Sequence, residues 1–223
     1  AMSLVSSCSV YPWSEWPDMA AQIVLEMNSL YAANPSVGEK LGGARSGVIA
    51  AGVDLLALFH RGRGGEVEAS LAECRRRVGD SRNPMEQVWL NYCVTVVRAR
   101  QGDASGALEH GRQSLEWSMQ LQNLWFRVLG HAARGQGFVS TGRLDEALVL
   151  FERSLLLCEK ATGPDHPDVA ITLLNLGNVQ YARGDLEKAS PLLERVVAIF
   201  ARALGGESPS LVQARADLGR VRL

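Results

Sequence analysis

Glycines and turn-forming segments recur at a fixed interval in the second half of this chain. A constant period of about 40 residues is typical of an array of helical hairpins. Each hairpin in such an array buries its apolar face only by stacking on its neighbours, and the stack leaves an extended curved surface for binding. The elements that stand 42 residues apart are Gly142 and Gly184, the segments 163–167 (GPDHP) and 205–209 (GGESP), and the series Gly135, Gly177 and Gly219.

The apolar residues between these turns are spaced for helices. Between Thr172 and Phe200 they fall at three- and four-residue steps on two segments that meet at Gly184, a pattern that predicts two amphipathic helices. The fold class expected is all-α, a right-handed superhelical array of antiparallel helix hairpins. The expected helices are 17–34, 37–60, 67–78, 88–100, 107–119, 124–140, 144–160, 167–183, 186–204 and 208–223.

Four regions follow from these segments. Residues 1–16 form an irregular N-terminal segment with Trp13 and Trp16, and residues 17–82 form divergent N-terminal hairpins. Residues 83–207 carry the clear repeats. Residues 208–223 form one further helix, either a polar cap on the array or the first half of a repeat in a longer protein.

Composition narrows the function classes. A net charge of −1 supplies no global field for nucleic acid or an acidic membrane. No apolar run approaches the roughly 18 residues of a membrane span. The four cysteines, at irregular spacing, fit neither a disulfide framework nor a zinc site, so reduced, mostly buried thiols and a cytoplasmic location are expected. Trp117, Leu121, Leu124 and Trp125 form a stripe expected in the core rather than in a cofactor pocket.

Residue types with catalytic or metal chemistry are scattered. His60, His110, His131 and His166 are far apart, and none lies in a catalytic or metal motif. The glycine-rich run 38–43 lacks the Gly-Lys-Ser/Thr of a phosphate loop, so it indicates close helix packing. Three arginines at 75–77 suit a helix C-terminus better than a nucleic-acid patch. We therefore expect no enzymatic activity, no cofactor and no metal.

One stretch resembles the tetratricopeptide repeat, whose pattern places a large residue, Leu-Gly and an aromatic on the first helix and small and large residues on the second. The residues that carry the resemblance are Leu173, Leu176, Gly177, Tyr181, Gly184, Ala189, Leu193 and Val196. The length of the unit and the linker GPDHPDVA are similar to the subclass found in kinesin light chains and in bacterial signalling proteins.

The copies upstream depart from this pattern. The preceding copy keeps Gly135 and Phe138 but has Arg134 where Leu is usual and His131 where a large apolar residue is usual. An earlier copy retains Gly102, Ala107 and Leu115, with Thr95 and Arg98 at key places, so that the register of its first helix is uncertain.

The resemblance implies that the first helices line a concave groove, where polar residues flanking Leu-Gly bind the backbone of an extended peptide. Those positions hold Asn175 and Asn178, then Ala133 and Gln136 in the preceding copy, and Asp217 and Arg220 in the last helix. The alternative is that the asparagines are solvated surface residues. Arg98, Arg100, Arg127 and Arg134 would favour an acidic ligand. The predicted peptide-binding residues are Asn175, Asn178, Gln136, Arg98, Arg134 and Tyr181.

The function expected first is a non-enzymatic scaffold that binds a peptide segment of another protein. The alternative is a regulatory sensor module of a larger signalling protein, in which ligand binding changes the curvature of the array. Self-association into a homo-oligomer, through the final helix or the Trp13 segment, is a third possibility.

Overall fold

The structure, a computed structural model, describes residues 52, 55–56, 64–78, 81–204 and 208–222. These residues contain eight bounded α-helices and no strand, which confirms the all-α prediction. The N-terminal segment 1–16 and the helices expected at 17–34 and over most of 37–60 lie outside the described residues. The helices are α5 (Gly64–Val78), α6 (Pro84–Arg100), α7 (Ala104–Ser118), α8 (Leu124–Ser140), α9 (Leu144–Thr162), α10 (Pro167–Ala182), α11 (Leu186–Leu204) and α12 (Pro209–Arg222).

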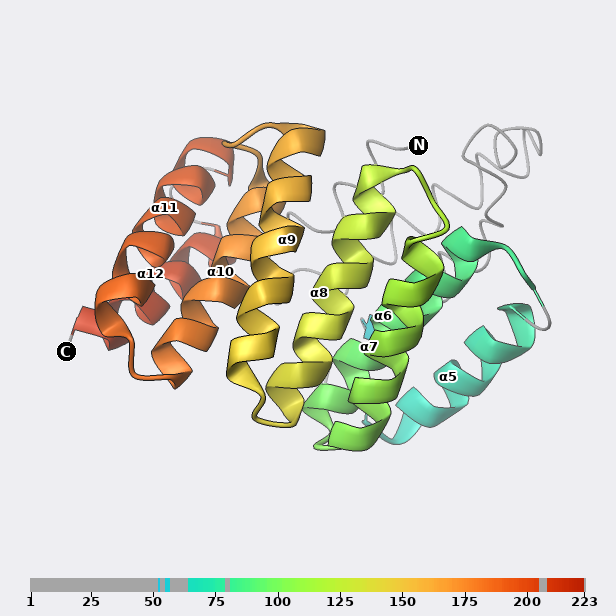
Figure 1. The fold of residues 1–223 in the computed structure, drawn as a ribbon. Coiled ribbons are helices and arrows are strands. Elements are labelled where there is room, and N and C mark those ends of the chain that lie inside the picture. Colours follow the sequence, from blue (N-terminus) through green and yellow to red (C-terminus); the bar gives the residue numbers. More distant parts are fainter. Residues whose placement is uncertain (1–51, 53–54, 57–63, 79–80, 205–207, 223) are drawn as a thin grey trace.

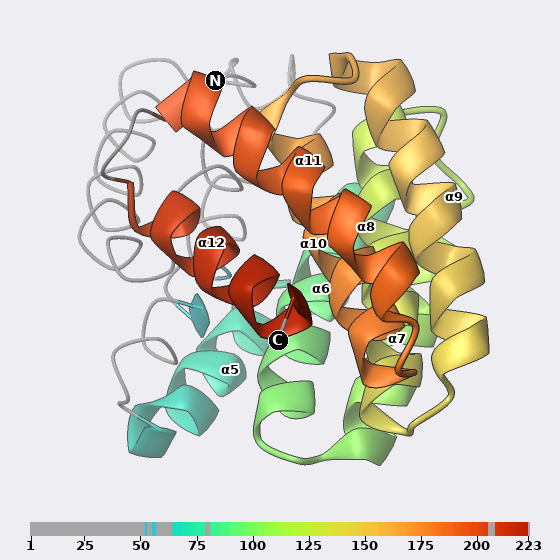
Figure 2. The ribbon, with the colours of Figure 1, turned by 90° about the vertical axis from the view of Figure 1, so that its left-hand side faces the viewer.

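Successive helices stand side by side in chain order and form an open array (Figure 1). The pairs α6–α7, α8–α9 and α10–α11 are hairpins, each of which packs on the next, and α12 packs on α11. The array is curved: Figure 2 shows α5 and α12, from its two ends, on one side, and α9, from its middle, at the opposite edge. The first helices therefore belong to a surface shared by several hairpins.

A left-handed glycine closes every hairpin. Gly102, Gly142 and Gly184 have φ of 79°, 74° and 83°, a region that costs other residues free energy. In each turn the following residue donates its N–H to a carbonyl five residues back, as Arg143 does to Phe138 at 2.9 Å. This Schellman arrangement satisfies carbonyls at the helix end, so the recurring glycines fix where each first helix stops.

Within the second and third hairpins, a glycine allows the two helices to approach closely. A Cβ added to Gly135 would lie 2.9 Å from the Phe151 ring, and one added to Gly177 would lie 3.0 Å from the Leu193 side chain. Phe151 and Leu193 are almost fully buried. Gly177 is therefore in close contact with the second helix of its hairpin.

The first hairpin has the same geometry at a 40-residue offset. Ser114 donates its hydroxyl to the Val88 carbonyl at 3.1 Å, and Ser154 donates to Val128 in the next hairpin at the same distance. This offset aligns Thr95 with Gly135, and it aligns Gly111 with Phe151. The small residue is thus on the second helix of this hairpin, which explains why its register was uncertain from the sequence.

Side-chain caps begin the first helices. Asn83 and Asn123 accept backbone N–H groups at the starts of α6 and α8, as favoured N-cap residues do. At α10 the cap is His166, whose Nδ1 accepts the N–H of Asp168. The neighbouring Asp165 pairs with Arg202 at 3.0 Å.

The aromatic stripe packs in the core, as expected. Trp125 stacks on Trp89 with ring centroids 6.2 Å apart, and it joins Trp117 and Leu121 against the buried cluster that α5, α6 and α8 share. These contacts connect the first described hairpin to the second.

Candidate functional site

The predicted asparagines lie on α10, between the neighbouring hairpins. Asn178 is exposed and Asn175 is half-buried. At the equivalent places of α8, Gln136 is half-buried and Ala133 is buried. Two polar positions on α10 and one on α8 therefore keep solvent access along these first helices.

Three of the predicted residues have uncommitted amide groups. In the part of the chain that the structure describes, the side chains of Asn175, Asn178 and Gln136 make no hydrogen bond. Each amide carries two N–H donors and a carbonyl acceptor, so each can bind both the N–H and the C=O of a peptide unit. Hydrogen bonds from the other described residues therefore do not compete for these groups.

The two predicted arginines are already engaged. Arg98 on α6 forms hydrogen bonds to both carboxylate oxygens of Glu68 on α5, at 2.6 and 3.1 Å, and this pairing lowers the pKa of Glu68. Arg134 donates to the Leu108 carbonyl at 2.8 Å and covers the Phe138 ring at 4.3 Å. Both guanidinium groups therefore connect helices within the array.

Tyr181, near the end of α10, faces a residue of the last helix. Its ring is 40% exposed, and the Arg220 guanidinium lies 5.7 Å from the ring centroid. Arg220 also pairs with the buried Asp217, which accepts a second hydrogen bond from Gln213 at 2.9 Å. The structure thus places the aromatic ring of Tyr181 next to the cationic side chain of Arg220. Gln213 was not anticipated, although its four-residue spacing from Asp217 is a readable signal.

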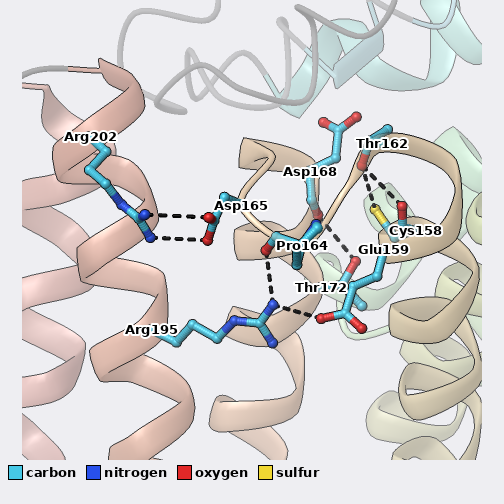
Figure 3. A network of polar contacts seen from close by, with 9 residues as sticks. All are labelled: Cys158, Glu159, Thr162, Pro164, Asp165, Asp168, Thr172, Arg195 and Arg202. Carbon is cyan, nitrogen blue, oxygen red and sulfur yellow. Dashed lines mark hydrogen bonds and ion pairs between the residues drawn. The ribbon is translucent and has the colours of Figure 1, made fainter.

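Two arginines of α11 hold the segment that precedes α10 (Figure 3). Arg195 bridges Glu159 at the end of α9, at 2.6 Å, and the Pro164 carbonyl, at 2.9 Å. Arg202 pairs with Asp165. These contacts fix the connection between the second and third hairpins, and with it the placement of the α10 surface.

In the described region, the side chains that could take part in catalysis are either unreactive or not clustered. Burial raises the pKa of the Cys158 thiol to about 11, so the thiol stays protonated and weakly nucleophilic. Among the described residues no cluster of His, Cys, Asp and Glu could hold a metal ion. Within the same residues, no helix combines the length and apolar character needed to cross a bilayer.

The tetratricopeptide repeat family matches residues 131–202, from the middle of α8 to the end of α11. Comparison with curated proteins gives no match.

Crystal structures share the fold at low sequence identity. BtubC (BKLC) from P. vanneervenii is 19% identical, over 94% of this chain and 82% of that one, with a TM-score of 0.63. The apo form of RapI is 15% identical; the match covers 87% of this chain and 54% of that one, with a TM-score of 0.56. A putative kinesin light chain of Podosopora anserina, with nearly identical TPR-like repeats, is 17% identical. The match covers 85% of this chain and 88% of that one, with a TM-score of 0.52.

Proposed function

We propose, from the premise that residues 131–202 are tetratricopeptide repeats in an all-α array, that this chain is a non-enzymatic scaffold binding a peptide segment of a partner protein. Repeat arrays of this kind use their curved surface for binding. The observation that carries the proposal is the set of uncommitted amides of Asn175, Asn178 and Gln136 on neighbouring first helices.

The ligand proposed is the backbone of an extended peptide. Asn175 and Asn178 are three residues apart on one helix and therefore neighbours on its surface, so they can bind adjacent peptide units. Tyr181 offers an exposed ring one turn further along α10. Arg98 and Arg134 would have to leave their present partners to bind an acidic ligand, so we leave them out of the contact set.

The test uses short random peptides displayed on phage and selected against the wild-type chain. Selected peptides are then measured by fluorescence anisotropy. Removing both amides with Asn175→Ala and Asn178→Ala should weaken binding about tenfold, because two hydrogen bonds of about 0.5–1.5 kcal/mol each are lost. Helicity by circular dichroism should stay unchanged.

The matched control removes two amides elsewhere. Gln120 and Gln122 are exposed in the connection between α7 and α8, and Gln120→Ala with Gln122→Ala should leave the Kd at its wild-type value. Equal affinity for the asparagine variant and the wild type would remove these residues from the site.

A regulatory sensor is the second candidate. It is favoured by the connection between α9 and α10, where the hairpins are joined by the side chains of Arg195 and Arg202. A peptide that displaced these contacts would change the curvature of the array. Small-angle X-ray scattering with and without a selected peptide should then show a changed radius of gyration, and an unchanged profile contradicts the idea.

Localisation and assembly state also remain proposals. Cys74, Cys93 and Cys158 are buried and form no disulfide within the described ranges, which is typical of a reducing compartment and supports a cytoplasmic location. Self-association into a homo-oligomer stays a prediction, which light scattering over a concentration series would test.

A further inference from the structure

Three basic side chains gather where α8 and α9 cross. Arg127 and His131 are four residues apart on α8, so they share one face of that helix. Ser154 of α9 donates its hydroxyl to the Val128 carbonyl of α8 at 3.1 Å, which brings the adjacent Arg153 to the same part of α8. The charges of Arg153 and Arg127 both act on His131.

Two nitrogens of this cluster are buried without a partner. His131 is only 5% exposed, and its Nδ1 makes no hydrogen bond with any described residue; the Nε of Arg127 is likewise buried and has no partner among these residues. Arg153 is exposed, and it too forms no ion pair or hydrogen bond with any residue in the described ranges. More than nine in ten buried polar groups in folded proteins have a partner. Two buried nitrogens without a partner among the described residues, four positions apart on one helix face, therefore point to a ligand.

The other two hairpins have different residues at the position equivalent to His131. In the third hairpin the equivalent of His131 is Leu173, an apolar core residue that needs no hydrogen bond. In the first hairpin it is Asn91, whose side-chain oxygen lies 2.8 Å from Nδ1 of His110. Of the three described hairpins, only the second has a buried polar side chain at this position with an atom that lacks a partner among the described residues. The packing of the repeat therefore does not account for His131.

The local electrostatic field favours an anion. Burial, together with the positive charges of Arg153 and Arg127, lowers the pKa of His131 to about 4. No carboxylate contributes to that shift. At Gly130, next to His131 in the sequence, α7 approaches with the uncharged side chain of Ser118 and the backbone of Leu115.

We propose that Arg127, His131 and Arg153 form an oxyanion-binding site for a phosphate or carboxylate group. The two guanidinium groups supply charge-assisted donors, and the His131 ring donates a further N–H. The occupied site would satisfy the buried nitrogens and hold α8 and α9 together. The site uses none of the side chains of Asn175, Asn178 and Gln136, and it does not depend on the proposed function.

The probes are inorganic phosphate and sodium acetate, each titrated into the full chain at constant ionic strength. The ring nitrogens and the pKa of His131 are followed by nuclear magnetic resonance, with His131→Leu to assign the signals. A saturable shift of the His131 resonances is expected with at least one probe, together with a rise of its pKa by at least one unit. The probe that acts identifies the group as phosphate or carboxylate, and an unchanged His131 with both probes overturns the proposal.

Variants separate binding from structure. Arg153→Gln should weaken binding of the active probe at least tenfold, whereas Arg215→Gln, which removes an exposed arginine of α12, should not. His131→Leu restores the residue type of the third hairpin, so it should raise the Tm without anion and abolish the stabilisation by anion. Full retention of affinity in Arg153→Gln, or equal stabilisation of His131→Leu by the probe, would show that the cluster binds no anion.

Discussion

At the scale of single residues, the array is set by small side chains at helix contacts. Gly135 faces the Phe151 ring, and Gly177 faces Leu193. The close-packed interior leaves no room for an added side chain. In the first hairpin the small residue has moved to Gly111 on the second helix, where an added Cβ would lie 2.6 Å from the Ala133 carbonyl of α8.

Gly177→Leu should destabilise the protein by about 1–3 kcal/mol, because the new side chain overpacks the contact with Leu193. Urea unfolding followed by circular dichroism measures the change. The matched control is Gly219→Leu, since Gly219 occupies the same repeat position with nothing within 4 Å of an added Cβ. Equal stabilities for both variants would show that the helices are not in close contact at Gly177.

At the scale of elements, the helix ends are determined locally and the connection before α10 is not. Its geometry depends on Arg195 and Arg202, which come from α11 and lie more than thirty residues from Pro164 and Asp165 in the sequence. Figure 3 shows the two side chains reaching the segment from the same direction. The third hairpin therefore positions its own link to the second.

The two arginines should contribute unequally to stability. Arg195 is partly buried against Glu159 and also donates to a carbonyl, so Arg195→Ala should cost about 1 kcal/mol after allowance for solvent screening. The pair of Arg202 and Asp165 is mostly exposed, and Arg202→Ala should cost less than about 0.5 kcal/mol. Thermal unfolding monitors both variants. The opposite order would mean that the loop is held by contacts other than these.

The sequence predicts the elements well because their signals are local. Gly142 and Gly184 end the helices that precede them, and Asn123 begins α8, each by a bond within a few residues. The partners of Arg98 and Arg134 lie 30 and 26 residues away, so no pattern in the chain indicates that these arginines are engaged. The peptide-binding role of Asn175 and its neighbours stays a prediction.

At the scale of the whole molecule, stability is a sum over neighbours. Each helix of the array contacts chiefly the helices next to it in sequence, so local contacts dominate and the ends have fewer partners than the middle. Arrays of this kind open from their ends rather than in a single step.

Native-state hydrogen exchange should therefore be graded along the chain. Amides of α12, which packs on α11 at one end of the described array, should exchange faster than those of α8 and α9, which have neighbours on both sides. Mass spectrometry of peptic fragments measures the difference. Uniform protection from α8 to α12 would indicate one cooperative unit and contradict the nearest-neighbour picture.

The array could be lengthened by joining further units to the chain, because no described residue packs on the face of α12 that carries Gly219. Gly219 offers the same bare backbone that Gly177 presents to its own hairpin partner, and Val212, about two turns away on α12, is an exposed apolar residue. A second copy of residues 186–204, fused after α12, is expected to pack on this helix without further substitutions. The length of this curved array can thus be set by the number of its units.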